Sequence, residues 1–182
     1  MRWPPPLPGR ARWAWLLGGR WRAWRLDRIL VLLDGRVRSG ALVGSIGSGP
    51  GFDAARLARR LAGGSARWLL VDPQRPMLTG TDPFDRPGDS TAVHRIVGDG
   101  ADLPLRSESV DVVLSLGVFC CMAEAAVPEA VAETLRVMRP GAWLLFAVPR
   151  RRGELDDRRW RAAGLRLVAS RRPGRSLFQK AL

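Results

Sequence analysis

VGSIGSGPG, residues 43–51, stands where a short apolar run gives way to an amphipathic stretch. Glycines at every second position from Gly47 to Gly51 allow a sharp turn and let a ligand reach the backbone. A helix that begins at about Phe52 would offer free N–H groups to an anionic group such as a carboxylate. A dinucleotide-binding turn would need its third glycine at the position of Phe52, so that phosphate-binding fingerprint fails. A purely structural tight turn is the alternative interpretation.

Outward from this loop, short apolar runs alternate with amphipathic stretches, a pattern that predicts strands connected by covering helices. We expect strands at 41–46, 68–71, 93–97, 110–116 and 143–148, helices at 52–62 and 128–138, and a loop at 78–92. Beyond residue 149 we expect a helix near 156–163 and a hairpin of 165–170 and 176–182 around Pro173 and Gly174. Uninterrupted apolar strands, such as the one with Val112 and Val113, are typical of a parallel sheet buried on both faces.

An acidic residue, Asp72, ends the second expected strand in the segment Leu69-Leu70-Val71-Asp72-Pro73. Its carboxylate oxygens can accept hydrogen bonds from both hydroxyls of a ribose that lies across the strand ends. A plain helix cap ahead of Gln74 is the alternative. Asp72 lies 21 residues beyond Gly51, and this separation favours the ribose.

The third motif, Gly98-Asp99-Gly100-Ala101-Asp102-Leu103-Pro104, precedes Val110-Asp111-Val112-Val113-Leu114-Ser115. With these motifs in this order, residues 41–149 resemble the small class I S-adenosylmethionine-dependent methyltransferases of the ubiquinone/menaquinone type. The later Leu135-Arg136-Val137-Met138-Arg139-Pro140-Gly141 is similar to that family's corner before the fifth strand. The resemblance implies an α/β, Rossmann-like fold with helices on both faces of a seven-stranded, mostly parallel sheet. It also implies an antiparallel last strand between strands five and six.

The same resemblance implies that S-adenosylmethionine is the cofactor. Gly47, Gly49 and Gly51 would line its methionine part, and Asp72 would bind its ribose. Asp99 and Gly100 would lie beside the adenine, and Leu116 and Gly117 beside the sulfonium. The expected cofactor-binding residues are therefore Ser45, Gly47, Ser48, Gly49, Gly51, Asp72, Pro73, Asp99, Gly100, Leu116 and Gly117.

Two positions depart from the family pattern. Ser45 stands where the family usually has an acidic residue, and a hydroxyl lacks the charge of a carboxylate. Phe119-Cys120-Cys121-Met122 occupies a stretch in which many relatives carry histidines. The single histidine, His94, is expected to be a surface or packing residue, and the two cysteines are expected to be buried packing groups. Asp99, Asp102 and Glu124 could assist the reaction, although the last two fit solvated or capping roles.

No catalytic residue is nominated, because alignment of the acceptor with an activated methyl donor can supply much of the rate. The adjacent cysteines form neither a zinc pattern nor a disulfide framework, which favours a reducing, cytoplasmic setting and predicts no metal. We expect no signal peptide, because the apolar stretches near the N-terminus are short and interrupted by arginines. No apolar run approaches the length of about 20 residues that a membrane span requires.

The net charge of +13 is concentrated at the two ends of the chain. Residues 1–40 hold nine basic and two acidic residues, and residues 150–182 hold eleven basic and three acidic residues. Residues 41–149, in contrast, hold ten basic and twelve acidic residues. We therefore divide the chain into a basic, Trp- and Arg-rich N-terminal arm and helical lid, 1–40, and a methyltransferase domain, 41–182. Trp13, Trp21 and Trp24 could line an acceptor pocket for a ring or isoprenoid, or simply cover the sheet.

The leading hypothesis is an enzyme that methylates a small, hydrophobic or aromatic acceptor. Tryptophan interleaved with arginine also suits peripheral contact with an anionic membrane surface. An RNA methyltransferase is the first alternative, given the pI of 11.7, but no separate RNA-binding module fits the chain, so nucleic acid is the less favoured partner. A methyltransferase-like protein that binds a ligand without transferring methyl is the second alternative, and Ser45 and the missing histidines keep it open. The pattern does not specify an oligomeric state.

Overall fold

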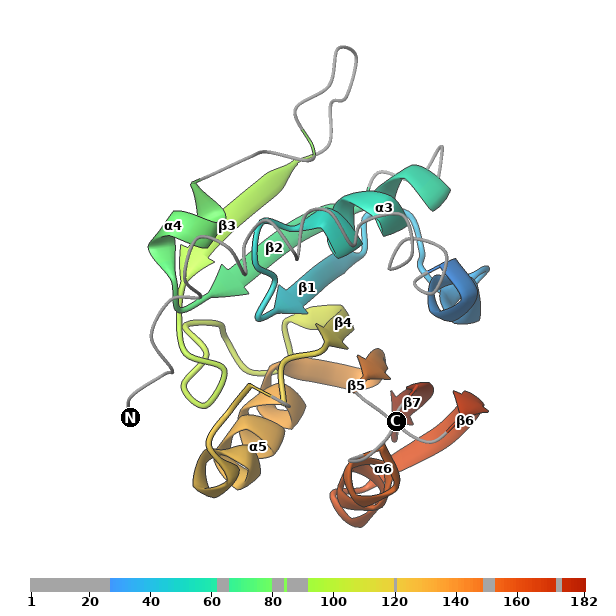
Figure 1. Ribbon diagram of the computed structural model, residues 1–182. Helices are drawn as coiled ribbons and strands as arrows, with labels where there is room; N and C mark the ends of the chain where they lie inside the picture. Colours follow the sequence, from blue (N-terminus) through green and yellow to red (C-terminus); the bar gives the residue numbers. More distant parts are fainter. Residues whose placement is uncertain are drawn as a thin grey trace.

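A seven-stranded sheet forms the centre of the computed structural model, which describes residues 27–61, 66–79, 84, 92–119, 121–148, 153–172 and 175–182 (Figure 1). The strands are β1 (Leu42–Ile46), β2 (Arg67–Asp72), β3 (Val93–Val97), β4 (Val110–Leu116), β5 (Met138–Ala147), β6 (Leu165–Arg172) and β7 (Arg175–Lys180). Their order across the sheet is β3-β2-β1-β4-β5-β7-β6. The expected α/β fold with seven strands is confirmed.

Strand direction follows the expected pattern. The pairs β3–β2, β2–β1, β1–β4 and β4–β5 are parallel, and β7 is antiparallel to both of its neighbours, β5 and β6. Because β7 lies between β5 and β6, the placement implied by the resemblance is confirmed. Strand order reverses between β1 and β4, and ligands of open α/β sheets bind at the carboxyl ends of the strands beside such a reversal.

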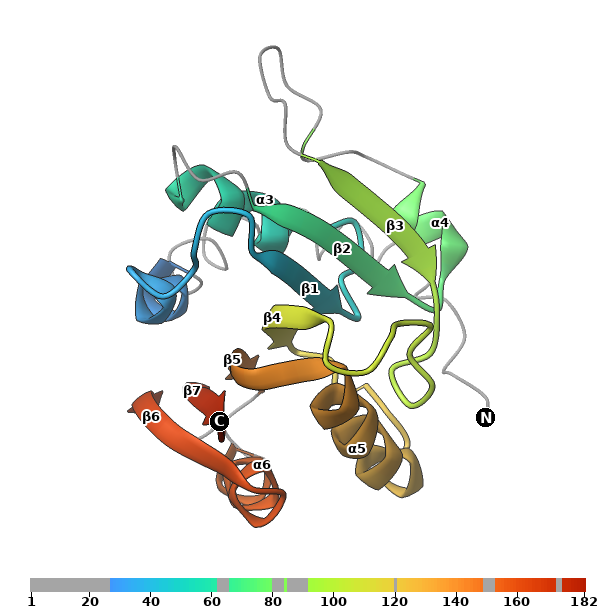
Figure 2. The ribbon, with the colours of Figure 1, turned by 180° about the vertical axis from the view of Figure 1, so that it is seen from behind.

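Helices cover both faces of the sheet (Figure 2). They are α3 (Phe52–Arg60), α4 (Arg75–Leu78), α5 (Val127–Val137) and α6 (Gly153–Ala162), with short 3-10 turns η1 (Val31–Leu33) and η2 (Glu124–Ala126). One core cluster packs Leu57 of α3 against Val43 and Leu114 of the sheet. The other packs Ala130 of α5 and Trp160 of α6 against the opposite sheet face. This two-sided burial explains the uninterrupted apolar strands, since β4 residues turn alternately into both clusters.

Most expected elements occur where the pattern placed them, and the main difference lies at β5. This strand begins at Met138, five residues earlier than expected, because Met138 pairs with Val110 at the start of β4. The register then shifts between Val110 and Val112, and Gly141 has a positive φ of 74° within the strand. An irregular stretch of strand therefore replaces the expected corner. Within the expected loop 78–92, α4 ends at Leu78, and residues 80–83 and 85–91 lie outside the described part of the chain.

The described part of the N-terminal segment, residues 27–40, packs on α3. Ile29, Leu30 and Leu33 are buried in the cluster that contains Leu57. Two ion pairs fasten the segment to the outer face of the helix, Arg56 with Asp27 and Arg60 with Asp34. The hydrogen-bonding guanidinium groups lower the pKa of both carboxyl groups. Trp13, Trp21 and Trp24 lie outside the described residues, so the helical lid stays a prediction.

Candidate functional site

The expected cofactor-binding residues gather at one edge of the sheet, where β1 to β4 end (Figure 2). Gly47 to Gly51 follow β1, Asp72 is the last residue of β2, Asp99 and Gly100 follow β3, and Gly117 follows β4. Because these four strands are parallel, their carboxyl ends lie side by side. Four segments that are far apart in the sequence thus form one edge, and the strand-order reversal lies within it.

The glycine loop needs glycine for its conformation and for its contacts. Gly47, Gly49 and Gly51 have φ of 61°, 54° and 90°, the left-handed region that disfavours side chains. A Cβ built on Gly47 would lie 2.6 Å from Cγ2 of Val118. One built on Gly51 would lie 2.6 Å from Cδ1 of Leu70. The loop after β1 therefore touches the loop after β4 directly, across the point where the strand order reverses.

Asp72 joins β2 to the glycine loop. Gly49 N–H donates a hydrogen bond of 2.8 Å to its Oδ2, and Gln74 N–H donates one of 2.9 Å to its Oδ1. Ser48 N–H adds a bond of 3.0 Å to the carbonyl oxygen of Val71. Asp72 therefore accepts the hydrogen bond expected of a helix cap, from Gln74, and also one from the glycine loop, from Gly49. Each carboxylate oxygen has a further lone pair, so the same group can still accept ribose hydroxyls.

Burial changes the acidity of this carboxyl group. The Asp72 residue is only 7% exposed, and removal from water raises the pKa of its carboxyl group above the ordinary value. The N–H bonds from Gln74 and Gly49 oppose the rise, because they stabilise the charged form. A ligand that donates hydroxyl hydrogen bonds would stabilise the charged form further.

The loop after β3 folds around Asp99. Ala101 N–H donates a hydrogen bond of 2.9 Å to Asp99 Oδ1, and Asp99 forms an isolated bridge with Asp102. Gly98 is tightly enclosed, since a Cβ there would lie 2.7 Å from Cδ of Pro104. Gly100 is buried, with ordinary contact distances to Ile46. The tight packing at Gly98 was missed by sequence reasoning, although the glycine was within the quoted motif.

An arginine and a glutamate of α5 hold the continuation of this loop. Arg136 donates to the carbonyl oxygens of Leu103 and Leu105 at 2.9 and 2.8 Å, and it pairs with Glu133. Glu133 Oε2 accepts a hydrogen bond of 2.7 Å from Leu103 N–H. Sequence reasoning missed this pair. The spacing of three residues on one helix was a usable signal for the Glu133–Arg136 contact, but it carried no information about Leu103.

The segment after β4 is apolar and closely packed. Gly117 has φ 86°, and Val118, Phe119 and Met122 are 5%, 3% and 9% exposed. The Phe119 ring meets those of Phe146 and Trp160 edge-on at centroid distances of 5.6 and 5.3 Å.

Cys121 corrects the expectation of buried cysteines. It is exposed, and its Sγ lies 3.5 Å from the carbonyl oxygen of Gly117. The turn after β4 brings its side chain outward although the surrounding sequence is apolar. Cys120 lies outside the described residues.

Other titratable candidates lie apart from the glycine loop. His94 is exposed on β3, as expected, near the end of the strand opposite to the loop. Glu124 is exposed and pairs with Arg159, and Asp102 is also exposed. Ser45 is 5% exposed, between Leu70 of β2 and Leu114 of β4.

The described residues show neither a metal-binding cluster nor a membrane-spanning helix. They contain no group of three or more His, Cys, Asp or Glu residues that could hold a metal ion. Within the same ranges, every helix is too short or too polar to cross a lipid bilayer.

Comparison with known proteins adds a family model and related sequences. A model described as a methyltransferase domain matches residues 45–146. A probable phthiotriol/phenolphthiotriol dimycocerosates methyltransferase of Mycobacterium ulcerans is 31% identical over 144 residues, which are 73% of this chain and 50% of that protein. The chain spans about a quarter to a half of the length of the curated relatives it matches.

Solved structures share the fold. An S-adenosylmethionine-dependent methyltransferase from Aquifex aeolicus matches with a TM-score of 0.62 and 21% identity, over 82% of this chain and 85% of that one. The 1,6-didemethyltoxoflavin-N1-methyltransferase of Burkholderia thailandensis, with its acceptor and S-adenosylhomocysteine bound, matches with a TM-score of 0.62 and 17% identity. That match covers 98% of this chain and 93% of the other. At these identities the likeness concerns the fold.

Proposed function

This chain belongs to the methyltransferase domain family, with S-adenosylmethionine as its cofactor, and we propose that it methylates a small, hydrophobic or aromatic acceptor. The observation that carries the proposal is the junction of the glycine loop with Asp72, in which Gly49 N–H donates to the carboxylate at 2.8 Å. This junction presents bare backbone and a buried carboxylate at the same edge of the sheet. Both features suit a ligand with an amino-acid part and a ribose.

The residues at this edge fit the cofactor. The loop of Gly47, Gly49 and Gly51 would hold the methionine part, Asp72 the ribose, and Asp99 with Gly100 the adenine. Ser45, Ser48, Pro73, Leu116 and Gly117 complete the proposed set. When bound, the cofactor supplies a methyl group on a positively charged sulfur, which leaves as a neutral thioether.

The chain's contribution to catalysis is positioning. His94, the only histidine of the chain, lies on the edge strand, and the segment after β4, which is proposed to begin beside the sulfonium, continues with apolar Val118 and Phe119. An apolar segment at this position would favour an acceptor with an apolar or aromatic body. The acceptor's proton would pass to solvent, as suits an acidic or already nucleophilic acceptor. The methyltransferase with bound 1,6-didemethyltoxoflavin supports a small-molecule acceptor over a nucleic acid.

Cofactor binding is tested first, by calorimetry with S-adenosylmethionine and S-adenosylhomocysteine. We expect binding to the wild-type chain and its loss in Gly49→Val, because the valine would occupy the face of the loop proposed to meet the ligand. Gly164→Val is the matched control, since Gly164 also has a positive φ, 88°, but has open space around it. Absence of binding at millimolar cofactor, or equal affinity in the two variants, would refute the proposed cofactor site.

The acceptor class is tested with labelled cofactor and separate fractions of small metabolites, lipids and RNA. We expect label in the small-metabolite or lipid fraction, and none with Gly49→Val. Label in the RNA fraction would show that the chain is an RNA methyltransferase. In that case its binding to RNA should weaken steeply as the salt concentration is raised. Cofactor binding without label in any fraction would favour the non-catalytic alternative.

A further inference from the structure

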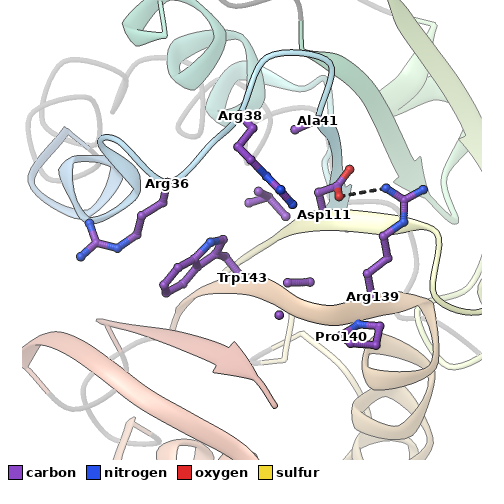
Figure 3. A pocket seen from close by; sticks show the side chains of 10 residues that line it. Arg36, Arg38, Ala41, Asp111, Arg139, Pro140 and Trp143 are labelled. Carbon is purple, nitrogen blue, oxygen red and sulfur yellow. Dashed lines mark hydrogen bonds and ion pairs between the residues drawn. The ribbon is translucent and has the colours of Figure 1, made fainter. Parts of the chain in front are cut away.

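A pocket lies at the edge of the sheet opposite to the glycine loop, where β1, β4 and β5 begin (Figure 3). Its lining comes from three segments: Arg36, Arg38 and Ala41 ahead of β1, Asp111 and Val112 of β4, and Arg139, Pro140, Gly141, Ala142 and Trp143 of β5. The pairing of Val112 with Trp143 sets the start of β4 level with the middle of β5. The pocket is therefore separated from the candidate cofactor site by the length of the strands.

The only carboxylate in this lining is already engaged. Asp111 Oδ1 accepts a hydrogen bond of 2.9 Å from Arg139, and its Oδ2 accepts one of 2.8 Å from Leu42 N–H. Arg139 also donates to the carbonyl oxygen of Glu108 at 3.1 Å. The Asp111–Arg139 pair is thus neutral as a unit, and within this lining no further acid balances the charge of Arg36 and Arg38.

Arg38 has no acidic partner in the pocket, because Asp111 is already paired with Arg139. Figure 3 shows its side chain extending between Trp143 and Asp111. Its guanidinium group makes no hydrogen bond or ion pair with the residues that the structure describes, and Asp111 is the only acid in the pocket. Arg36 donates one hydrogen bond of 3.2 Å to the carbonyl oxygen of Asp34 and lies over the Trp143 ring at 5.4 Å from the centroid, and these two contacts leave its other guanidinium N–H groups for a ligand.

The chemistry of a phosphate monoester matches this lining. Three arginines and one aspartate leave a surplus of two positive charges, and a phosphate monoester carries about −1.5 to −2 at pH 7. Its three terminal oxygens can receive donors from several directions outside a single plane, whereas the two oxygens of a carboxylate accept hydrogen bonds mainly in one plane. The flat face of Trp143 supplies a wall for whatever the phosphate is attached to.

We propose that this pocket binds the phosphate group of a phosphate monoester, with Arg38 as its principal donor and Arg36 and Arg139 beside it. The ligand is either a soluble monoester or the headgroup of phosphatidic acid, which share this group. The site does not depend on methyl transfer, because none of its residues belongs to the candidate cofactor site. It gives part of the chain's basic charge a specific role.

The first test titrates the full chain with inorganic phosphate by calorimetry at constant ionic strength, since exposed charges are screened by salt. We expect Arg38→Gln to weaken phosphate binding by about tenfold or more, because a charge-assisted hydrogen bond is lost. Asp111→Asn should strengthen it, because removal of the carboxylate charge removes repulsion while the amide oxygen can still accept from Leu42. Arg158→Gln, at an exposed arginine of α6, is the matched control and should leave binding unchanged.

The second test separates the two sources of the group. The chain is sedimented with phosphatidylcholine vesicles that contain or lack phosphatidic acid. Arg38-dependent sedimentation with phosphatidic acid identifies the headgroup, and Arg38-dependent binding of inorganic phosphate alone identifies a soluble monoester. No binding in either test, or binding that is equal in wild type and Arg38→Gln, would refute the site. S-adenosylmethionine affinity in Arg38→Gln, expected to equal that of wild type, shows independently that the variant is folded.

Discussion

Replacing Asp72 by alanine gives the sharpest test of the candidate cofactor site. The carboxylate accepts hydrogen bonds of 2.8 Å from Gly49 N–H and 2.9 Å from Gln74 N–H, and the residue is only 7% exposed. If its remaining lone pairs receive ribose hydroxyls, the substitution removes hydrogen bonds to a charged group. We expect S-adenosylhomocysteine binding to weaken by about 1 to 3 kcal/mol, or about 5- to 150-fold in Kd.

A loss of affinity alone does not separate ribose binding from support of the loop, because Asp72 also holds Gly49. The assay therefore compares S-adenosylhomocysteine with its 2′-deoxy analogue in wild type and in Asp72→Ala, by calorimetry. If Asp72 accepts the hydroxyl, the analogue binds about tenfold or more weakly to wild type, and the ratio of the two Kd values falls toward one in the variant. The same ratio in both proteins would refute the ribose assignment and leave Asp72 a support for the loop.

Four further predictions concern the same edge of the sheet. Because burial raises the pKa of Asp72, S-adenosylmethionine affinity should fall as pH drops through that raised pKa, and calorimetry should show a flatter pH profile in Asp72→Ala. The contribution of Asp72 to the free energy of unfolding should instead rise as the pH falls, because a carboxyl group with a raised pKa binds its proton more tightly in the folded state. Thermal unfolding of wild type and Asp72→Ala over a series of pH values checks this sign. Gly47→Ala should lower the free energy of unfolding by about 2 to 4 kcal/mol, through its positive φ and the 2.6 Å approach to Val118. Gly35→Ala, with φ 69° and open space, should show only the cost of φ, so an equal loss in both would contradict the steric contact. Arg136→Gln should speed amide hydrogen exchange over residues 101–105 and weaken cofactor binding modestly; unchanged exchange there would show that the contacts with Leu103 and Leu105 do not hold the loop.

The strands of the sheet were largely predictable because their signals are local. The bounds of β3 and β4 match the expected 93–97 and 110–116, since each strand begins at a valine, is rich in β-branched or aliphatic residues and is followed by a glycine. The start of β5 was not predictable, because Pro140 and Gly141 have the composition of a turn. Pairing with β4 overrides that composition, and a single sequence does not encode which strand lies alongside.

The site divides in the same way. The glycine loop and Asp72 were predictable from their place between a strand and a helix. Their mutual hydrogen bond was not, because it joins residues that are 23 positions apart. The exposure of Cys121 was misjudged because a turn after β4 reverses the facing that an apolar neighbourhood suggests. The hydrogen bonds from Arg136 to the carbonyl oxygens of Leu103 and Leu105 were not predictable either, because they too join residues that are far apart in the sequence.

The two edges of the sheet carry opposite kinds of charge, and this separation bears on both proposals. Carboxylates of Asp72, Asp99 and Asp102 lie at the edge where the strands β2 and β3 end, whereas Arg36 and Arg38 lie where β1 begins. A ligand with a positive sulfonium is favoured at the first edge, and a doubly charged anion is favoured at the second. At low salt each edge attracts its own ligand and repels the other, so phosphate should not compete with S-adenosylmethionine. Competition between the two ligands would show that they share one site and would contradict the assignment of separate edges.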